Sequence, residues 1–290
     1  MPSSPAQQPI LDWYDGHGRD LPWRRPHVGG WAVLVSEVML QQTPVRRVLP
    51  VYDAWIHRWP DPASLASERP GQAVRMWGRL GYPRRALRLH QAAVVIEQRH
   101  DGAVPSELVE LRALPGVGEY TAAAVSAFAY HQRAVVLDIN VRRVLGRLFA
   151  GHQYPPASLI KVERDQARAL LPDDPDVSAR WSAAVMELGA VICTSSAPHC
   201  GRCPVSTQCA WRFAGYPEYD GPPRRGQAYA GTDRQCRGRI LSVLRDSDEP
   251  VTVAVIEATW ADVVQRERAL ATLLADGLVV RADEGALALP

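Results

Sequence analysis

The chain has 290 residues, a hydrophobic content of 47% and a net charge of +2, which together allow about two domains with cores of their own. No run approaches the roughly 18 uninterrupted apolar residues of a membrane helix, so we expect no membrane contact. The N-terminus has no basic segment followed by an apolar one, so we expect no export signal and a cytoplasmic protein. A net charge this small does not by itself indicate a nucleic-acid partner.

The first 215 residues predict a helical body, because apolar residues recur there at helical spacing. No stretch of strict alternation long enough for a strand occurs before about residue 277, which predicts an all-α fold for this part. A further apolar stripe at helical spacing follows residue 140. The expected helices cover residues 9–15, 30–42, 45–58, 71–80, 84–99, 108–113, 119–130, 158–171 and 178–192.

The segment Leu114-Pro-Gly-Val-Gly118 joins two of these predicted helices. Two glycines and a proline in so few residues predict a tight hairpin whose backbone N–H groups point outward at the start of the second helix. Such a turn is an anion site suited to a DNA phosphate. The alternative is an ordinary helical hairpin.

Two acidic residues occupy special helical positions. Glu37 lies at the edge of the apolar stripe of the 30–42 helix, between Leu34 and Gln41. Asp138 stands just before a helical stripe, where a helix N-cap is expected. Each also has a simple alternative, a solvated helix acid for Glu37 and a cap alone for Asp138.

Four of the five cysteines follow a C-x6-C-x2-C-x5-C pattern: Cys193, Cys200, Cys203 and Cys209. Two disulfides would suit a small secreted domain, which this chain does not resemble. Structural zinc usually takes paired knuckles, and only Cys200 and Cys203 form one. The spacing favours a 4Fe–4S cluster held by four thiolates, with zinc as the alternative. Cys236 lies apart and is expected to be a partly buried free thiol.

The C-terminal part differs in composition. Residues 216–231 are rich in glycine and proline and predict a linker. Helices are expected at about 234–246, 252–257 and 260–275, followed by short strands at 277–280 and 286–289. Three helices and a hairpin form a winged-helix pattern, which serves DNA binding and protein contacts alike.

Lys161 is the only lysine, and the arginines occur in clusters. A genome with a bias toward arginine codons accounts for the ratio, but the clustering suggests contact with phosphate groups, which guanidinium forks suit well. The clustered residues are Arg24, Arg25, Arg46, Arg47, Arg84, Arg85, Arg88, Arg142, Arg143, Arg224 and Arg225.

Taken together, these motifs resemble the helix-hairpin-helix base-excision glycosylases with an iron–sulfur loop, and among them the MutY-type adenine DNA glycosylases. The resemblance covers about residues 9–215, and its most specific part is the octapeptide SEVMLQQT, from Ser36 to Thr43. The other matching motifs are Gly81-Tyr82, the 114–118 hairpin, Leu137-Asp138 with Asn140-Val141, and Met186-Glu-Leu-Gly-Ala190.

The resemblance implies two helical lobes with a 4Fe–4S loop and, here, a small winged-helix-like α+β unit at the C-terminus. Residues 1–28 and 134–215 would form the iron–sulfur lobe, and residues 29–133 a six-helix lobe with the hairpin. The linker and the tail would cover residues 216–231 and 232–290. We expect a monomer, since no heptad or apolar surface repeat appears.

The implied activity is removal of adenine mispaired with 8-oxoguanine or guanine in double-stranded DNA, which predicts association with the nucleoid. The departing base must be protonated, and the oxocarbenium-like sugar must face a negative charge. Glu37, its pKa raised by apolar neighbours, would be the acid, and Asp138 the ionised partner. Tyr120 and Asn140 would support this pair.

The target base must be flipped out of the duplex, and the resemblance assigns residues to that step. Tyr82 would be the wedge beside the opposite base, with Gln42 and Thr43 reading the gap. Trp23 and Arg24 match the wall of the base pocket. Leu80, Gly116 and Gly118 complete the expected DNA-binding set.

Three positions bear on specificity. Sister enzymes resembling endonuclease III carry a Schiff-base lysine where this chain has Tyr120, so we expect a monofunctional enzyme that leaves an abasic site. Ala183 stands where many relatives have a Glu or Gln that contacts adenine. Residues 232–290 are too short for the Nudix-like domain of longer relatives.

Two other functions compete with this one. A related mismatch or oxidised-pyrimidine glycosylase is disfavoured by Tyr120 and by SEVMLQQT. A non-catalytic iron–sulfur DNA sensor is the other candidate, but it would not explain why Glu37 and Asp138 occur at their positions in the motifs. Docking of a sliding clamp or a mismatch-repair protein on the linker is left open.

Overall fold

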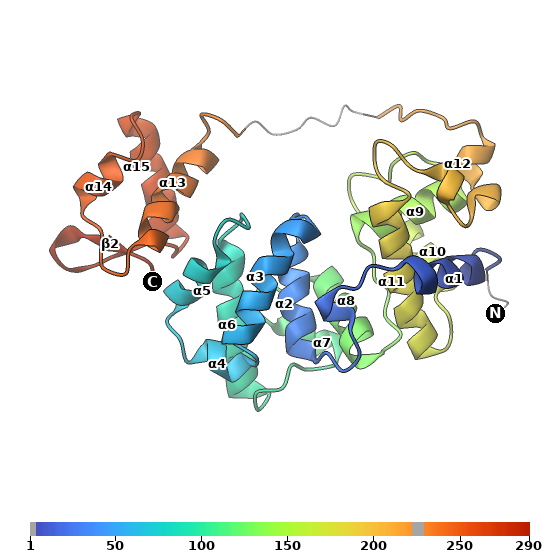
Figure 1. Ribbon diagram of the computed structural model, residues 1–290, viewed down its shortest axis with the longest axis horizontal. Helices are drawn as coiled ribbons and strands as arrows, with labels where there is room; N and C mark the ends of the chain where they lie inside the picture. Colours follow the sequence, from blue (N-terminus) through green and yellow to red (C-terminus); the bar gives the residue numbers. More distant parts are fainter. Residues whose placement is uncertain (1–3, 222–228) are drawn as a thin grey trace. The chain divides into compact units, whose positions relative to one another are not determined.

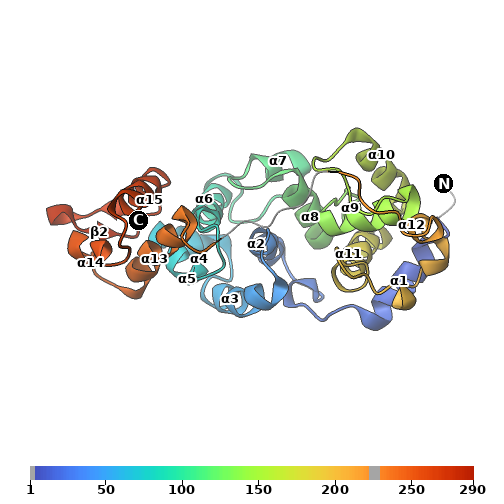
Figure 2. The ribbon, with the colours of Figure 1, turned by 90° about the horizontal axis from the view of Figure 1, so that it is seen from above.

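A computed structural model describes residues 4–221 and 229–290, and shows the expected helical protein (Figure 1, Figure 2). Residues 222–228 of the predicted linker lie outside the described part. The chain forms two compact units. The first comprises Met1–Val33, Ser106–Arg112 and Val117–Pro222, and the second Leu34–Pro105, Ala113–Gly116 and Pro223–Pro290. The predicted domain boundaries stay a prediction.

The first unit is built around helix α11, which packs against α1, α8 and α9. Its core joins apolar residues of α1 and α11, such as Ile10 and Leu188, to Val144 and Leu148 from the segment around α9. Asp174 begins α11, because its side chain accepts a hydrogen bond from the N–H of Val177 at 2.9 Å. The helices are α1 (Gln7–His17), α8 (Glu119–Tyr130), α9 (Ile139–Leu145), α10 (Lys161–Leu170), α11 (Pro175–Val191) and α12 (Ala210–Phe213).

The second unit begins within helix α2 and contains the helices up to α6. Its core holds three tryptophans in edge-to-face contact: Trp55 lies 4.6 Å from Trp59 and 5.8 Å from Trp77, measured between ring centroids. Such pairs add to the stabilisation that burial alone gives. The helices are α2 (Gly30–Leu40), α3 (Val45–Arg58), α4 (Pro62–Ala66), α5 (Pro70–Trp77) and α6 (Arg84–Arg99). Helix α7 (Leu108–Ala113) belongs to the first unit except for its last residue.

The C-terminal segment of the second unit contains three helices and a hairpin, as predicted. Helices α13 (Asp233–Asp246) and α15 (Val263–Ala275) pack together, and α14 (Val253–Glu257) lies between them in sequence. Strands β1 (Val280–Arg281) and β2 (Leu287–Ala288) are antiparallel. Cys236 is a free thiol that is fully buried rather than partly buried.

This segment contacts helix α5 of the same unit. Arg75 donates to the carbonyl of Ser247 at 2.7 Å, and Arg245 Nε donates to the carbonyl of Val74 at 3.1 Å. The N–H of Gly71 donates to the carbonyl of the last residue, Pro290. Backbone acceptors on both sides therefore hold the C-terminal segment against α5.

The all-α prediction for the first 215 residues is confirmed, with changes at several helix ends. Helix α2 ends at Leu40 rather than 42, since Gln42 has a left-handed backbone with φ +54°. Helix α5 ends at Trp77, where Gly78 turns the chain with φ +53°. Helix α4 was not predicted. The two strands are shorter than expected. In residues 4–221 and 229–290 no helix is both long and apolar enough to cross a membrane.

Candidate active site

The predicted site residues belong to both units, and each group is described within its own unit. Glu37, Gln42, Thr43, Leu80, Tyr82 and Gly116 lie in the second unit, and the others in the first.

Asp138 is the N-cap of helix α9, as predicted. Its Oδ1 accepts from the N–H of Val141 at 2.6 Å, and its Oδ2 accepts from the side-chain amide of Asn140 at 2.7 Å. The residue keeps some accessible surface, yet desolvation raises the pKa of its carboxyl group, while the bonds from Val141 and Asn140 and the charge of Arg143 oppose that rise. The carboxylate is thus fixed in direction by the start of a helix.

Asn140 connects Asp138 to helix α11 and to the cysteine loop. Its Oδ1 accepts from Arg143 Nη2 at 2.8 Å, and the same arginine donates to the carbonyls of Gly189 and Cys193. A Cβ on Gly189 would lie 2.8 Å from the Cβ of Asn140, so only glycine allows this approach of α11 to α9. This contact explains the glycine in the Met186–Ala190 motif.

Tyr120 lies in the first turn of α8 and packs against a small cluster that includes Ala124 and Val136. Before it, Gly118 occupies the N-cap position and offers no side chain to cap the helix. Gly116 has φ +81°, and a Cβ there would lie 2.8 Å from the Cβ of Arg88. The two glycines are exposed, which keeps the backbone of this turn open to a ligand.

The turn Pro22–Arg24 is held by a residue that sequence analysis did not single out, Glu187 of α11. Its carboxylate accepts from Arg24 Nη1 at 2.8 Å and from Arg19 Nε at 2.5 Å and Nη2 at 2.8 Å. Burial acts to raise the pKa of Glu187, but the bonds and charges of Arg19 and Arg24 outweigh it and lower that pKa. Its membership in the Met186–Ala190 motif was the available signal.

Glu37 is 4% exposed, which rules out a solvated helix acid. We expected Glu37 at the edge of a one-sided apolar stripe, but the buried surface of this helix is not one-sided. Every residue from Val33 to Met39 is buried, so helix α2 is enclosed on all sides in this stretch. A helix that is apolar almost all round is typical of a core position.

Gln42, Thr43, Leu80 and Tyr82 lie on two turns that are bonded to each other. The Thr43 hydroxyl is within hydrogen-bond distance of the carbonyl of Leu80, at 3.3 Å. Gln42 and Tyr82 both have left-handed backbones, with φ of +54° and +46°. Tyr82 is 49% exposed, as a wedge requires, whereas Leu80 and Thr43 are buried. Sequence analysis missed Arg85 as the residue that bonds both turns.

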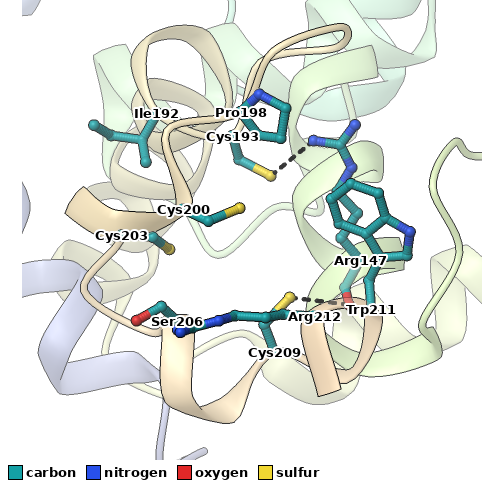
Figure 3. Close-up of a pocket in the computed structure, with 10 residues that line it drawn as sticks. All are labelled: Arg147, Ile192, Cys193, Pro198, Cys200, Cys203, Ser206, Cys209, Trp211 and Arg212. Carbon is teal, nitrogen blue, oxygen red and sulfur yellow. Dashed lines mark hydrogen bonds between the residues drawn. The ribbon is translucent and has the colours of Figure 1, made fainter. Parts of the chain in front are cut away.

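The four cysteines of the predicted set line one pocket, with their sulfur atoms directed into it (Figure 3). Arg147 donates to Cys193 Sγ at 3.4 Å and to the carbonyl of Thr194 at 2.8 Å. Burial raises the pKa of the Cys203 thiol to about 11. All four are free thiols, so the disulfide alternative is wrong.

Only some of the clustered arginines are exposed, as contact with a DNA phosphate requires. Arg85, Arg142 and Arg143 are buried, and their guanidinium groups bond to protein acceptors. For these three the phosphate prediction is wrong. Arg46, Arg47, Arg84 and Arg88 are exposed, and Arg224 and Arg225 lie outside the described residues.

Comparison with known proteins places the chain in a class. Residues 35–167 match the family model of the HhH-GPD superfamily base excision DNA repair proteins. The structure of a thermostable thymine-DNA glycosylase aligns with a TM-score of 0.64 and 27% identity, over 71% of this chain and 94% of that one. Endonuclease III bound covalently to DNA aligns with a TM-score of 0.61 at 19% identity, which concerns the fold alone. The chain is thus a helix-hairpin-helix base-excision glycosylase.

Sequence relatives define the family within this class. The chain is 53% identical to the adenine DNA glycosylase of Mycobacterium tuberculosis, over 97% of this chain and 92% of the relative. It is 52% identical to that of Mycolicibacterium smegmatis, over 100% and 97%. The human adenine DNA glycosylase is 39% identical over 70% of this chain but only 38% of its own length. The chain belongs to the adenine DNA glycosylase family.

Proposed function

We propose that the protein hydrolyses the N-glycosidic bond of adenine mispaired with 8-oxoguanine or guanine in double-stranded DNA. The observation that carries this proposal is the fixed carboxylate of Asp138, held by Val141 and Asn140 at the start of α9 in a chain of the adenine DNA glycosylase family.

In the reaction, the bond between the sugar C1′ and adenine N9 breaks, and the bonding electrons leave with the base. Glu37 gives a proton to the departing adenine and then takes one from the water that adds to C1′. Burial of Glu37 supports the acid role, because a low-dielectric surrounding favours a neutral carboxyl group. Asp138 stabilises the cationic sugar or bonds to it transiently.

Binding of the substrate is assigned to the remaining site residues. Tyr82 inserts beside the opposite base, and Gln42 and Thr43 read the gap while adenine is flipped out. The exposure of Tyr82 supports its role. Trp23 and Arg24 line the base pocket, and Glu187 orients that arginine. The exposed backbone at Gly116 and Gly118 contacts a phosphate.

The product is an abasic site rather than a broken strand. Lyase chemistry of this class needs a lysine that attacks the sugar, and the corresponding place holds Tyr120. Lys161 is exposed on α10 and pairs with Asp165 at 2.6 Å. It is not in the position that the Schiff-base lysine occupies, so we expect no lyase activity.

The four cysteines hold a 4Fe–4S cluster. Their sulfur atoms face one pocket (Figure 3), yet no group of three or more His, Cys, Asp or Glu in the described residues is arranged to hold a metal ion. Four thiols directed into one pocket supply the ligand set of a 4Fe–4S cluster, and zinc held by four thiolates stays the alternative. The cluster would fix the loop that carries the exposed Arg202 and Arg212.

We further propose that the protein acts as a monomer in the cytoplasm, at the nucleoid, on duplexes with an adenine mispair.

Replacement of Glu37 tests the proposal. Glu37→Gln should abolish adenine release from a duplex with adenine opposite 8-oxoguanine, while duplex binding persists. Glu97→Gln, an exposed change on α6, is the matched control and should leave both unchanged. Base release by Glu37→Gln at the wild-type rate would refute the acid role. DNA binding without base release by the wild type would instead support a sensor.

A further inference from the structure

We propose that Arg85 is a positioning residue that holds the two turns bearing Gln42, Thr43 and Tyr82 in register and thereby sets the preference for 8-oxoguanine over guanine opposite adenine. This inference rests on the proposed function of these turns. Arg85 itself contacts neither base.

Arg85 is 8% exposed in the first turn of α6, and among the described residues no carboxylate pairs with its guanidinium group. Desolvation lowers the pKa of Arg85 to about 10. A buried cation without an anion is unusual, because its charge is compensated only by dipoles. Its position therefore calls for a reason other than charge pairing.

The positive charge of Arg85 is compensated by backbone carbonyl groups that accept hydrogen bonds from both Nη atoms. Nη1 donates to the carbonyls of Val38 at 2.8 Å, Met39 at 3.2 Å and Gln41 at 2.6 Å. The carbonyls of Val38 and Met39 are among those that the end of α2 leaves without helical partners, and that of Gln41 follows the helix directly. A cation at this end also opposes the negative pole of the helix dipole. Arg85 is thus a side-chain cap on the helix that carries Glu37.

The other nitrogen extends the network to the second turn. Nη2 donates to the Thr43 hydroxyl at 3.0 Å and to the carbonyl of Gly81 at 3.1 Å. The guanidinium carbon lies 5.1 Å from the Trp77 ring centroid and 5.5 Å from that of Tyr82. One planar group therefore contacts both turns and the wedge residue.

Both turns need such support, because each holds a residue with a side chain in the left-handed region. Gln42 has φ +54° and Tyr82 has φ +46°, conformations that L residues adopt at a cost in free energy. The bonds to Gln41, Thr43 and Gly81 flank these two residues on the chain. Loss of the bonds should let each turn relax separately, which would separate the reading residues from the wedge.

Lysine is the informative replacement. Its ammonium group keeps the charge but lacks the planar fork, so it cannot bond both turns at once. We expect Arg85→Lys to lower single-turnover adenine release opposite 8-oxoguanine by roughly 10- to 100-fold, and release opposite guanine by much less. Arg99→Lys, an exposed change on the same helix, should alter neither rate.

Rates are measured under single-turnover conditions with protein in excess, after burst titration has given the active fraction. A purely structural role would reduce the active fraction and leave the ratio of the two rates unchanged. That result would overturn the inference. A fall in the ratio for Arg85→Lys and not for Arg99→Lys would support it.

A double-mutant cycle with Tyr82→Ala adds a second test. If Arg85 acts through the turns, Arg85→Lys should have little further effect in the Tyr82→Ala background, whereas independent effects would multiply and contradict the inference. If Arg85→Lys does not fold, Thr43→Val replaces it, since this change removes the hydroxyl that accepts from Arg85 and contacts the carbonyl of Leu80, and so weakens the same link between the turns. An unchanged ratio in Thr43→Val would then refute the inference. No adenine release by the wild type would refute the proposed function instead.

Discussion

The candidate site residues of the two units are held in different ways. In the first unit, side chains at helix ends bond to one another: Asp138 to Asn140, and Glu187 to Arg24. In the second unit, the left-handed turns at Gln42 and Tyr82 are held by a buried guanidinium group, that of Arg85, together with the contact between Thr43 and Leu80. Charges fixed on helices suit bond breaking, which needs preorganised electrostatics. Turns that a bonding network holds in register suit recognition of a base, because their reading residues keep a fixed spacing from the wedge.

The largest effect on adenine release is expected from a change at Asp138, the carboxylate fixed at the start of α9. Asp138→Asn should keep the cap of α9, because Asn is as good an N-cap as Asp, but it removes the negative charge that we propose for stabilising the sugar cation. Adenine release should fall by roughly 1,000-fold, while the thermal unfolding midpoint changes little. Single-turnover kinetics and a melting curve measure both. A rate within tenfold of the wild type would show that the charge of Asp138 is dispensable.

The next effect concerns the ion pairs of the same unit. Glu187→Gln should destabilise the protein by about 3 kcal/mol at neutral pH, because it leaves Arg19 and Arg24 without their anion. The folded-state pKa of Glu187 is lowered, so its contribution is present above the ordinary glutamate range and is lost as the pH falls through that lowered value. The variant should therefore lose less stability in acid than the wild type. Denaturant unfolding between neutral and acid pH measures this, and parallel pH curves would contradict it.

A smaller effect on adenine release is expected from a change at Tyr82, on one of the two left-handed turns. Tyr82→Ala should lower adenine release opposite 8-oxoguanine by roughly tenfold, through loss of stacking with the duplex. Its stability should be nearly unchanged, since the side chain is 49% exposed. Comparing rates with the melting temperature separates recognition from folding. A large fall in the melting temperature would show that Tyr82 supports the core instead.

The smallest effect is expected from a change at Asp174, which tests the stability of the first unit away from the proposed site. Asp174→Ala removes the side-chain cap of α11, which should cost about 1 kcal/mol of stability. Adenine release at moderate temperature should stay at the wild-type rate, because Asp174 lies outside the proposed site. A selective loss of activity would indicate that the position of α11 is more sensitive than its contacts suggest.

Sequence reasoning was most successful where local chemistry decides the structure. The cap at Asp138 follows from its place before a helical stripe, and the convergence of the cysteines from their spacing. It failed where tertiary packing decides. Glu37 is enclosed because neighbouring segments cover α2 on all sides, which helical periodicity within α2 does not encode.

The roles of Arg85 and Glu187 were missed in the sequence for the same physical reason. Arg85 and Glu187 act on partners far along the chain, up to 47 and 168 residues away. Arginine clustering suggested phosphate contact for Arg85, but burial and carbonyl acceptors decide its role. The left-handed turn at Gln42 carried no glycine to signal it. Such features depend on which carbonyls the folded chain leaves without partners.

The central claim is tested most directly by one assay of the wild-type protein on a duplex carrying adenine opposite 8-oxoguanine. Single-turnover base release is scored together with strand breaks, with and without alkali. The account predicts release of adenine and breaks only after alkali. Breaks without alkali, release of thymine from a thymine–guanine duplex in place of adenine, or no base release would contradict it.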